Sequence, residues 1–200
     1  MTETIQYENG VYVGEIHEGK RHGYGRYEWK DGSSYEGDFA EGRRTGKGIF
    51  SWPGGSFYQG DFIEDRRTGK GLFYWPDGNR YEGEFLDGRM TGAGVFYFAS
   101  GDRYEGFFED GVRTGLGVFT HASGEKSIGR FADGKREGTF TVLYPDGGVF
   151  LGDYRHDKRH GAGVYTYPDG VAEKQTWESG VLISSEPLGA EISADGAEEQ

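Results

Sequence analysis

The sequence predicts an all-β protein: an elongated, single-layer antiparallel β-meander built from about seven hairpin repeats of 23 residues. Three observations indicate this fold. A Tyr-x-Gly triplet recurs every 23 residues, glycine and aromatic residues recur in phase with it, and Pro-Gly turns separate short segments that alternate between two faces. Repetition at this period is typical of arrays in which each unit buries surface only against its neighbours. An enclosed catalytic pocket is therefore not the default expectation.

The repeat begins with the triplet and continues through a second glycine. The first seven copies start at Tyr12, Tyr35, Tyr58, Tyr81, Tyr104, Ser127 and Phe150. In every copy except the sixth, another glycine stands eleven residues after the glycine of the triplet. The sixth copy has Phe140 at that position and His121 and Ser127 in place of the usual Trp-Tyr pair. We expect Phe140 to meet Phe131 in an aromatic clash or a rearrangement, with a local change in the twist of the sheet.

Each repeat should contribute two strands, about fourteen in all. In the second copy, Tyr35–Phe39 and Gly48–Trp52 alternate with period two, which predicts short strands. Segments such as PGGSF (53–57) carry Pro followed by Gly and predict tight turns. The link AEGRRTGK (40–47) has glycine on both sides of a charged tip and predicts a longer loop at the other edge.

Pairing the strands around the five-residue turn places Trp52 opposite Tyr58, Phe50 opposite Gly60, and Gly48 opposite Phe62. Each of these glycines would then be covered by a ring from the neighbouring strand, which offsets the poor strand propensity of glycine. The opposite face should carry solvated carboxylates beside an aliphatic column.

Composition sets the domain organisation and excludes several classes of partner. We expect one repeat array over residues 5–180, ending in a capping half-repeat, and an acidic, mobile tail over residues 181–200. Thirty-eight glycines placed periodically argue against a flexible linker, and the absence of cysteine excludes disulfides and thiolate chemistry. The formal net charge of −12 disfavours nucleic acid and anionic membranes. The N-terminus has no signal peptide pattern and no apolar run could span a membrane, so we expect a cytoplasmic protein.

The phased pattern Tyr-x-Gly-x-Phe followed by Gly-x-Gly-x-Phe/Tyr resembles the MORN repeat (membrane occupation and recognition nexus) over nearly all of residues 7–180. This resemblance implies a curved single-layer sheet with a groove that serves as a scaffold, similar to short MORN adaptors and radial-spoke head MORN proteins. It also implies a protein partner, helical or extended, in a cytoskeletal, axonemal or ciliary assembly. Homodimerisation stays open.

Two surfaces are candidates for binding. The first is an aromatic groove, because Tyr and Trp give large contact areas at low entropic cost; its predicted residues are Trp29, Tyr35, Trp52, Tyr58, Trp75, Tyr81, Phe98 and Tyr104. The alternative is a phospholipid-binding or anion-binding edge at the hairpin tips, formed by Arg43, Arg44, Arg66, Arg67, Arg89, Arg113, Lys135 and Arg136. Acidic residues precede these cations in the same links, so self-neutralising edge charges are the favoured interpretation.

No catalytic residue, cofactor or metal site is predicted. The recurring Gly46-x-Gly48 lacks the helix that a dinucleotide-binding loop requires. His156 and His160 have the spacing of two metal ligands on one face of a helix, but no helix is expected here. Carboxylate pairs such as Glu36 and Asp38 should lie in solvent, without the cleft that a glycosidase needs. We expect a non-enzymatic protein.

Overall fold

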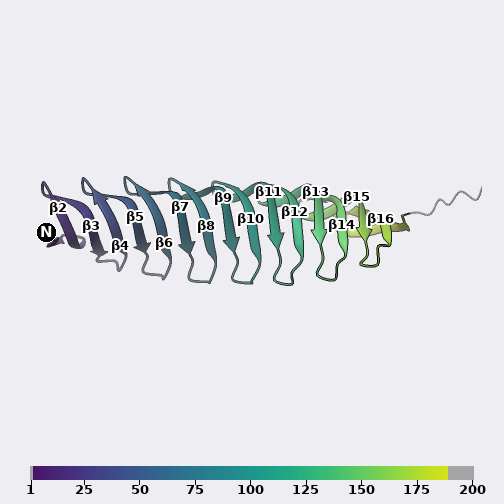
Figure 1. The fold of residues 1–200 in the computed structure, drawn as a ribbon, viewed down its shortest axis with the longest axis horizontal. Coiled ribbons are helices and arrows are strands. Elements are labelled where there is room, and N and C mark those ends of the chain that lie inside the picture. The colour runs from purple at the N-terminus through teal and green to yellow at the C-terminus, as the bar shows by residue number, and fades with distance from the viewer. Residues whose placement is uncertain (1, 189–200) are drawn as a thin grey trace, which may run out of the picture.

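The computed structural model describes residues 2–188 and is an all-β, single-layer antiparallel sheet of seventeen strands (Figure 1). The strands are β1 (Thr2–Tyr7), β2 (Gly10–His17), β3 (Lys20–Trp29), β4 (Ser34–Ala40), β5 (Arg43–Ser51), β6 (Phe57–Ile63), β7 (Arg66–Tyr74), β8 (Arg80–Leu86), β9 (Arg89–Tyr97), β10 (Arg103–Glu109), β11 (Val112–Thr120), β12 (Lys126–Ala132), β13 (Lys135–Leu143), β14 (Val149–Arg155), β15 (Lys158–Thr166), β16 (Ala172–Glu178) and β17 (Val181–Pro187).

Each strand pairs with the next along the chain, so the predicted meander is confirmed. The sheet extends beyond the predicted array at both ends. Residues 181–187, which we placed in the tail, form β17 and pair with β16. The rest of the predicted tail, residues 189–200, lies outside the described residues. No helix within residues 2–188 is long and apolar enough to cross a membrane.

Two kinds of turn alternate along the chain, one kind at each end of the strands (Figure 1). The wide turn follows the Pro-Gly signal: Trp52 N–H donates to Ser56 O, and Gly55 N–H donates to Trp52 O. The other turn is tight, because β4 ends at Ala40 and β5 begins at Arg43. The predicted loop over residues 40–47 is therefore wrong. Glu41 and Gly42 form the turn with φ of 51° and 83°, the left-handed pair that a two-residue hairpin requires.

The strands continue toward the tight turn because a β-bulge absorbs two residues. Gly37 lies opposite Gly48, but Asp38 lies opposite Thr45, so Gly46 and Lys47 are extra residues on β5. The amide of Lys47 donates to Asp38 Oδ2 at 2.9 Å. The same bond joins Lys70 N–H and Asp61 Oδ2 in the next repeat, at 3.1 Å. These carboxylates, which we expected to be only solvated, hold the bulge amide.

The predicted register is shifted, and with it the identity of the ring that covers glycine. Phe50 lies opposite Tyr58, and Gly48 lies opposite Gly60. The wide turn spans Trp52 to Ser56 and is closed by Ser51 opposite Phe57, so both closing residues lie one residue earlier in the chain than we predicted. A Cβ at Gly60 would lie 2.5 Å from the Tyr58 hydroxyl, and a Cβ at Gly71 would lie 2.5 Å from Tyr58 Cε2. The tyrosine of each triplet, and not Phe50, therefore covers a glycine pair.

These tyrosines form the core, on the side of the sheet that we call the ring face. Their rings alternate edge to face with phenylalanines from β4 to β12, at centroid separations of 4.9–5.3 Å. The Tyr58 hydroxyl donates toward Asp61 O at 3.1 Å and Thr68 O at 3.4 Å. Buried tyrosine hydroxyls need such acceptors, so the ring fixes both the glycine pair and the bulge beside it.

The sixth repeat keeps the core by exchanging two positions. Ser127 leaves no ring over Gly129, and the ring of Phe140 occupies that space instead, 2.6 Å from where a Gly129 Cβ would lie. Phe140 is fully buried and packs edge to face with Phe131 at 5.4 Å. The predicted clash is therefore wrong. Ser127 accepts a bond from Arg136 Nη1 at 3.3 Å.

Candidate functional site

The predicted aromatic groove is split by the structure into core and surface. Tyr35, Tyr58, Tyr81 and Tyr104 have no exposed surface. They cannot contact a partner, because they cover the glycine pairs. The other predicted residues, Trp29, Trp52, Trp75 and Phe98, are partly buried and pack against this core.

The tryptophans belong to a continuous ladder of rings on the ring face. Ten rings follow one another at centroid separations of 4.4–5.7 Å, namely Tyr27, Trp29, Phe50, Trp52, Phe73, Trp75, Phe96, Phe98, Phe119 and His121. Arginines lie over these rings: the guanidinium of Arg67 is 5.4 Å from the Trp52 centroid and 5.3 Å from that of Phe73. The ring face is thus largely occupied by its own side chains.

Burial on the ring face alters the acid–base behaviour of these groups. Desolvation raises the pKa of Tyr58 and of Tyr81 to about 12, with smaller effects from neighbouring charges. Desolvation likewise lowers the pKa of Arg67, whose Nη2 donates to Gly88 O at 2.9 Å. The neutral phenol and the guanidinium are both held by backbone carbonyls, which is the arrangement of a structural core.

The basic hairpin tips are neutralised by carboxylates one repeat further along. In the ladder of tight turns, Arg43 pairs with Glu64 at 3.3 Å, and Arg66 pairs with Asp87 at 2.8 Å. Arg89 pairs with Asp110 at 3.1 Å, Arg44 with Asp65 at 2.9 Å, and Arg136 with Asp157 at 3.5 Å. The favoured interpretation of self-neutralising charges agrees with these pairs. Arg67 and Arg113 instead donate to carbonyls, those of Gly88 and Gly134.

A long groove lies on the other side of the sheet, which we call the open face. Its cavity of about 1070 Å³ is lined by residues from Tyr24 to Phe107 and so crosses strands β3 to β10. The paired glycines, such as Gly60 and Gly71, form part of its lining. Because their only covering rings lie on the ring face, the backbone itself is accessible from the groove. The groove that we expected on the aromatic side of the sheet therefore lies on the opposite side.

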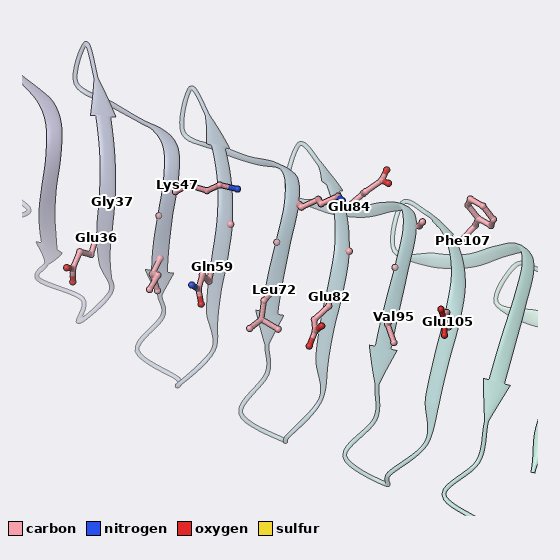
Figure 2. A pocket seen from close by; sticks show the side chains of 18 of the residues that line it. Glu36, Gly37, Lys47, Gln59, Leu72, Glu82, Glu84, Val95, Glu105 and Phe107 are labelled. Carbon is pink, nitrogen blue, oxygen red and sulfur yellow. The ribbon is translucent and has the colours of Figure 1, made fainter. Parts of the chain in front are cut away.

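Two rows of side chains border the glycines on the open face (Figure 2). In the first row, aliphatic residues alternate with acidic or amide residues across neighbouring strands; the row contains Glu36, Ile49, Gln59, Leu72, Glu82, Val95 and Glu105. Its acids have basic neighbours: Arg80 pairs with Glu82 at 3.3 Å, and Arg103 with Glu105 at 2.5 Å. The second row contains Lys47, Lys70, Glu84 and Phe107. An amphipathic surface results.

The open face becomes more apolar from β10 onward. Phe107 replaces the bulge carboxylate that Asp61 provides earlier, and Leu116 replaces the lysine of the same bulge. Ile128 and Leu151 replace the acid or amide of the first row. These four side chains are 51%, 64%, 40% and 50% exposed, respectively. We call Phe107, Leu116, Ile128 and Leu151 the apolar patch; aligned repeats show its substitutions, but only the structure shows that they share one face.

The described part of the chain offers no arrangement of side chains that would hold a metal ion. Residues 2–188 contain no group of three or more His, Cys, Asp or Glu side chains arranged to hold a metal. His156 lies beside Glu137, and His160 accepts a weak bond from the Ser179 amide. His156 is exposed in the turn before β15, and His160 is half-buried within β15.

Comparison with known proteins places the repeat in a family. The model of the family described as MORN repeat matches residues 12–34, 35–57, 58–80, 81–103, 104–126 and 150–171. It therefore covers more than half of the chain and omits residues 127–149, the repeat in which Ser127 and Phe140 have exchanged roles. No curated protein matches the sequence.

Solved structures with a similar fold include TCP domains of SAS-4 and CPAP. The SAS-4 (dCPAP) TCP domain of Drosophila melanogaster, in complex with a proline-rich motif of Ana2, has a TM-score of 0.52 and 11% identity, with 88% of this chain and 90% of that chain covered. The TCP10c domain of Drosophila melanogaster Sas-4 has a TM-score of 0.48 and 12% identity, with 88% and 100% covered. The TCP10 domain of Danio rerio CPAP has a TM-score of 0.40 and 15% identity, with 94% and 95% covered. At these identities the first likeness shows the shared fold alone.

Proposed function

The chain belongs to the MORN-repeat family, and we propose that it is a non-enzymatic scaffold that docks a helical or extended protein segment along the groove of its open face. The single observation that carries this proposal is the groove itself, about 1070 Å³ in volume and open along strands β3 to β10. Extended single-layer repeat arrays commonly bind partners along such surfaces. The ring face, in contrast, already carries its own layer of arginines.

The apolar patch supports a protein partner in particular. Scattered exposed apolar residues are ordinary, but a contiguous set with a polar surround is typical of a protein-binding site. Leu116 lies in β11 beside Arg130 of β12, and Ile128 lies beside Val118. Thr141 of β13 lies between Ile128 and Leu151, so the patch residues are distributed over strands β10 to β14 with polar side chains among them. Aromatic and aliphatic anchors with a polar rim are the residues that dominate binding energy at protein interfaces.

We also propose the kind of assembly to which the scaffold belongs. The fold neighbour from Drosophila melanogaster is a TCP domain in complex with a proline-rich motif of Ana2, and the family resemblance includes radial-spoke proteins. We therefore assign the chain to a cytoplasmic cytoskeletal, axonemal or ciliary assembly with a protein partner. The half-exposed residues Trp29, Trp52, Trp75 and Phe98 stay as a second proposed contact surface.

The test uses the repeats as their own control. The variant Phe107→Asp with Leu116→Lys gives the fifth repeat the residues that the third has at Asp61 and Lys70, without changing the net charge. We expect partners recovered from the source cell with the parent protein to be lost with this variant. The control Arg66→Glu with Arg89→Glu changes only exposed tip charges and should keep the same partners. The reverse result, with loss only in the tip variant, would assign docking to the charged edge.

Phospholipid binding at the tips is the alternative that the same variants decide. Arg43, Arg66 and Arg89 are exposed and each is paired with a carboxylate. The protein should therefore sediment poorly with anionic vesicles at physiological salt. Strong, salt-sensitive sedimentation that disappears in the tip variant would favour membrane tethering instead.

A further inference from the structure

The charge of the open face changes sign along the array, at strand β12. Each even-numbered strand from β4 onward places three alternating residues on this face. They are Ser34, Glu36 and Asp38 in β4, and Lys126, Ile128 and Arg130 in β12. Strand β8, between these two, carries one cation and two carboxylates, Arg80, Glu82 and Glu84. The open face is therefore acidic near its N-terminal end and basic at the sixth repeat.

The two cations of β12 have no acidic partner in the described part of the chain. At the position of Lys126, strand β10 has Arg103, which is paired with Glu105. Within residues 2–188, neither Lys126 nor Arg130 forms an ion pair. Glu137, on the neighbouring strand β13, accepts the amide of a residue in the next tight turn instead. An external carboxylate could therefore bind these cations without displacing an internal one.

Apolar side chains lie beside both cations. Leu143 of β13 lies opposite Lys126, and Leu116 of β11 lies opposite Arg130. Ile128 lies between the two cations on β12. Leu143, Leu116 and Ile128 are 37%, 64% and 40% exposed, respectively. Since a strand rises about 3.3 Å per residue, the surface has an apolar centre with a cation at each end, about 13 Å apart.

This combination of groups selects the chemistry of a ligand. Carboxylates on either side of an aliphatic or aromatic side chain complement the surface, and a protein segment can supply both. Nucleic acid and anionic lipid suit it less well, because their many phosphates would also meet the field of a chain whose net charge is −12. The stems of lysine and arginine add further apolar contact next to their charges.

We propose that the protein segment docked on the open face is acidic and apolar where it crosses β12. An apolar side chain of the segment packs on Ile128, and its carboxylates pair with Lys126 and Arg130. The proposal rests on the docking function of the open face and specifies the ligand. Complementary charges of this kind contribute specificity and association rate more than affinity. The carboxylates of β4 also disfavour the reversed orientation, in which the acidic end of the segment would lie near them.

A phage-displayed library of random peptides tests this ligand chemistry directly. Selection against the parent protein should enrich peptides that carry Asp or Glu beside Leu, Ile or Phe. The variant Lys126→Glu with Arg130→Glu should bind these peptides about tenfold or more weakly, and selection against it should enrich Lys and Arg instead. Both cations are exposed, so this variant should keep the melting temperature of the parent. The control Arg66→Glu with Arg89→Glu changes the net charge equally at the tight turns and should change binding by less than about threefold.

Each other outcome of the selection contradicts the proposal in a distinguishable way. An equal loss in both charge variants would show an effect of net charge and not of a local site. Peptides lost in Leu72→Asp but insensitive to Lys126 and Arg130 would keep the docking function and overturn the acidic ligand. Peptides insensitive to every open-face variant would contradict both proposals. Selected sequences that match residues 189–200, which contain four carboxylates, would assign the surface to the chain's own C-terminus. A selection without any peptide that depends on Lys126 and Arg130 would also refute the proposal.

Discussion

The exchange between Ser127 and Phe140 offers a quantitative test of how the ring face is built. Returning the sixth repeat to the common pattern takes two changes, Ser127→Tyr and Phe140→Gly. Phe140 is fully buried, so its loss alone should cost about 3–5 kcal/mol, as for other buried aromatic deletions. Ser127 is also fully buried, and its replacement by Tyr alone would force a ring into the space of Phe140, which should cost about 1–3 kcal/mol.

The double variant should be much more stable than the sum of these changes. A tyrosine at 127 would cover Gly129 and the new glycine at 140, as Tyr104 covers Gly106 and Gly117. The double variant should still be less stable than the parent, because Val142 occupies the position that Phe119 has in the fifth repeat. We expect the double variant within about 2 kcal/mol of the parent, whereas the two single losses add to about 4–8 kcal/mol, so the coupling should be at least about 2 kcal/mol, toward the upper end for contacting residues.

Urea unfolding monitored by circular dichroism measures all four proteins of this cycle, provided that the transitions are two-state with similar slopes. Distant and independent positions add within about 0.3–0.5 kcal/mol. A coupling in that range would show that Phe140 does not occupy the place of the missing tyrosine ring, and the explanation of the sixth repeat would be refuted.

Three further predictions follow from the same architecture. Burial raises the pKa of Tyr58 and Tyr81 from 10.0 to about 12, so the folded state keeps these protons at a higher pH than the unfolded chain does. The stability that these tyrosines contribute should be fully present below pH 10 and should fall as the pH rises from 10 toward 12. An unfolding free energy from urea titrations that does not change across that range would contradict the burial. Asp61→Ala removes the acceptor for the Lys70 amide and should cost about 1–2 kcal/mol of unfolding free energy, with Gln59→Ala as an exposed control expected within about 0.5 kcal/mol. Small-angle scattering should show a particle about 77 Å long from seventeen strands at ~4.8 Å spacing, and a radius of gyration near the ~16–17 Å of a globular 200-residue domain would exclude the single layer.

The repeat and the meander could be predicted from the sequence because period, turn residues and alternation all report local backbone preferences. The register could not, because it depends on where the wide turn closes. Trp52 looks like the last strand residue by alternation, yet its amide bonds to Ser56 O inside the turn. The bulge was missed for a related reason: Gly46 has a φ of 54°, but a glycine between Thr45 and Lys47 is also compatible with a loop.

The candidate site was predicted less well, because aromatic residues in a one-layer sheet can serve as core or as binding surface. Burial decides between these roles only once the rings are placed. Tyr58 then belongs to the core, and the arginine column beside it covers Trp52. The apolar patch did leave a sequence signal, since Phe107 and Leu116 break the charged pattern that earlier repeats keep at the bulge.

The two faces differ in how freely a repeat can change, and this difference leads to a final prediction. Asp61 holds the amide of Lys70, whereas Phe107, at the same place in the fifth repeat, has no oxygen to accept the Leu116 amide. The fifth repeat thus lacks a stabilising bond and exposes two large apolar side chains. Phe107→Asp with Leu116→Lys should restore the bond and raise the unfolding free energy by about 0.5–2 kcal/mol. The same variant should lose the partner. Increased stability together with lost capture cannot result from unfolding, and calorimetry beside a binding assay measures both. A variant that is less stable than the parent would show that Phe107 contributes to the fold, and the argument that these residues are present for docking would fail.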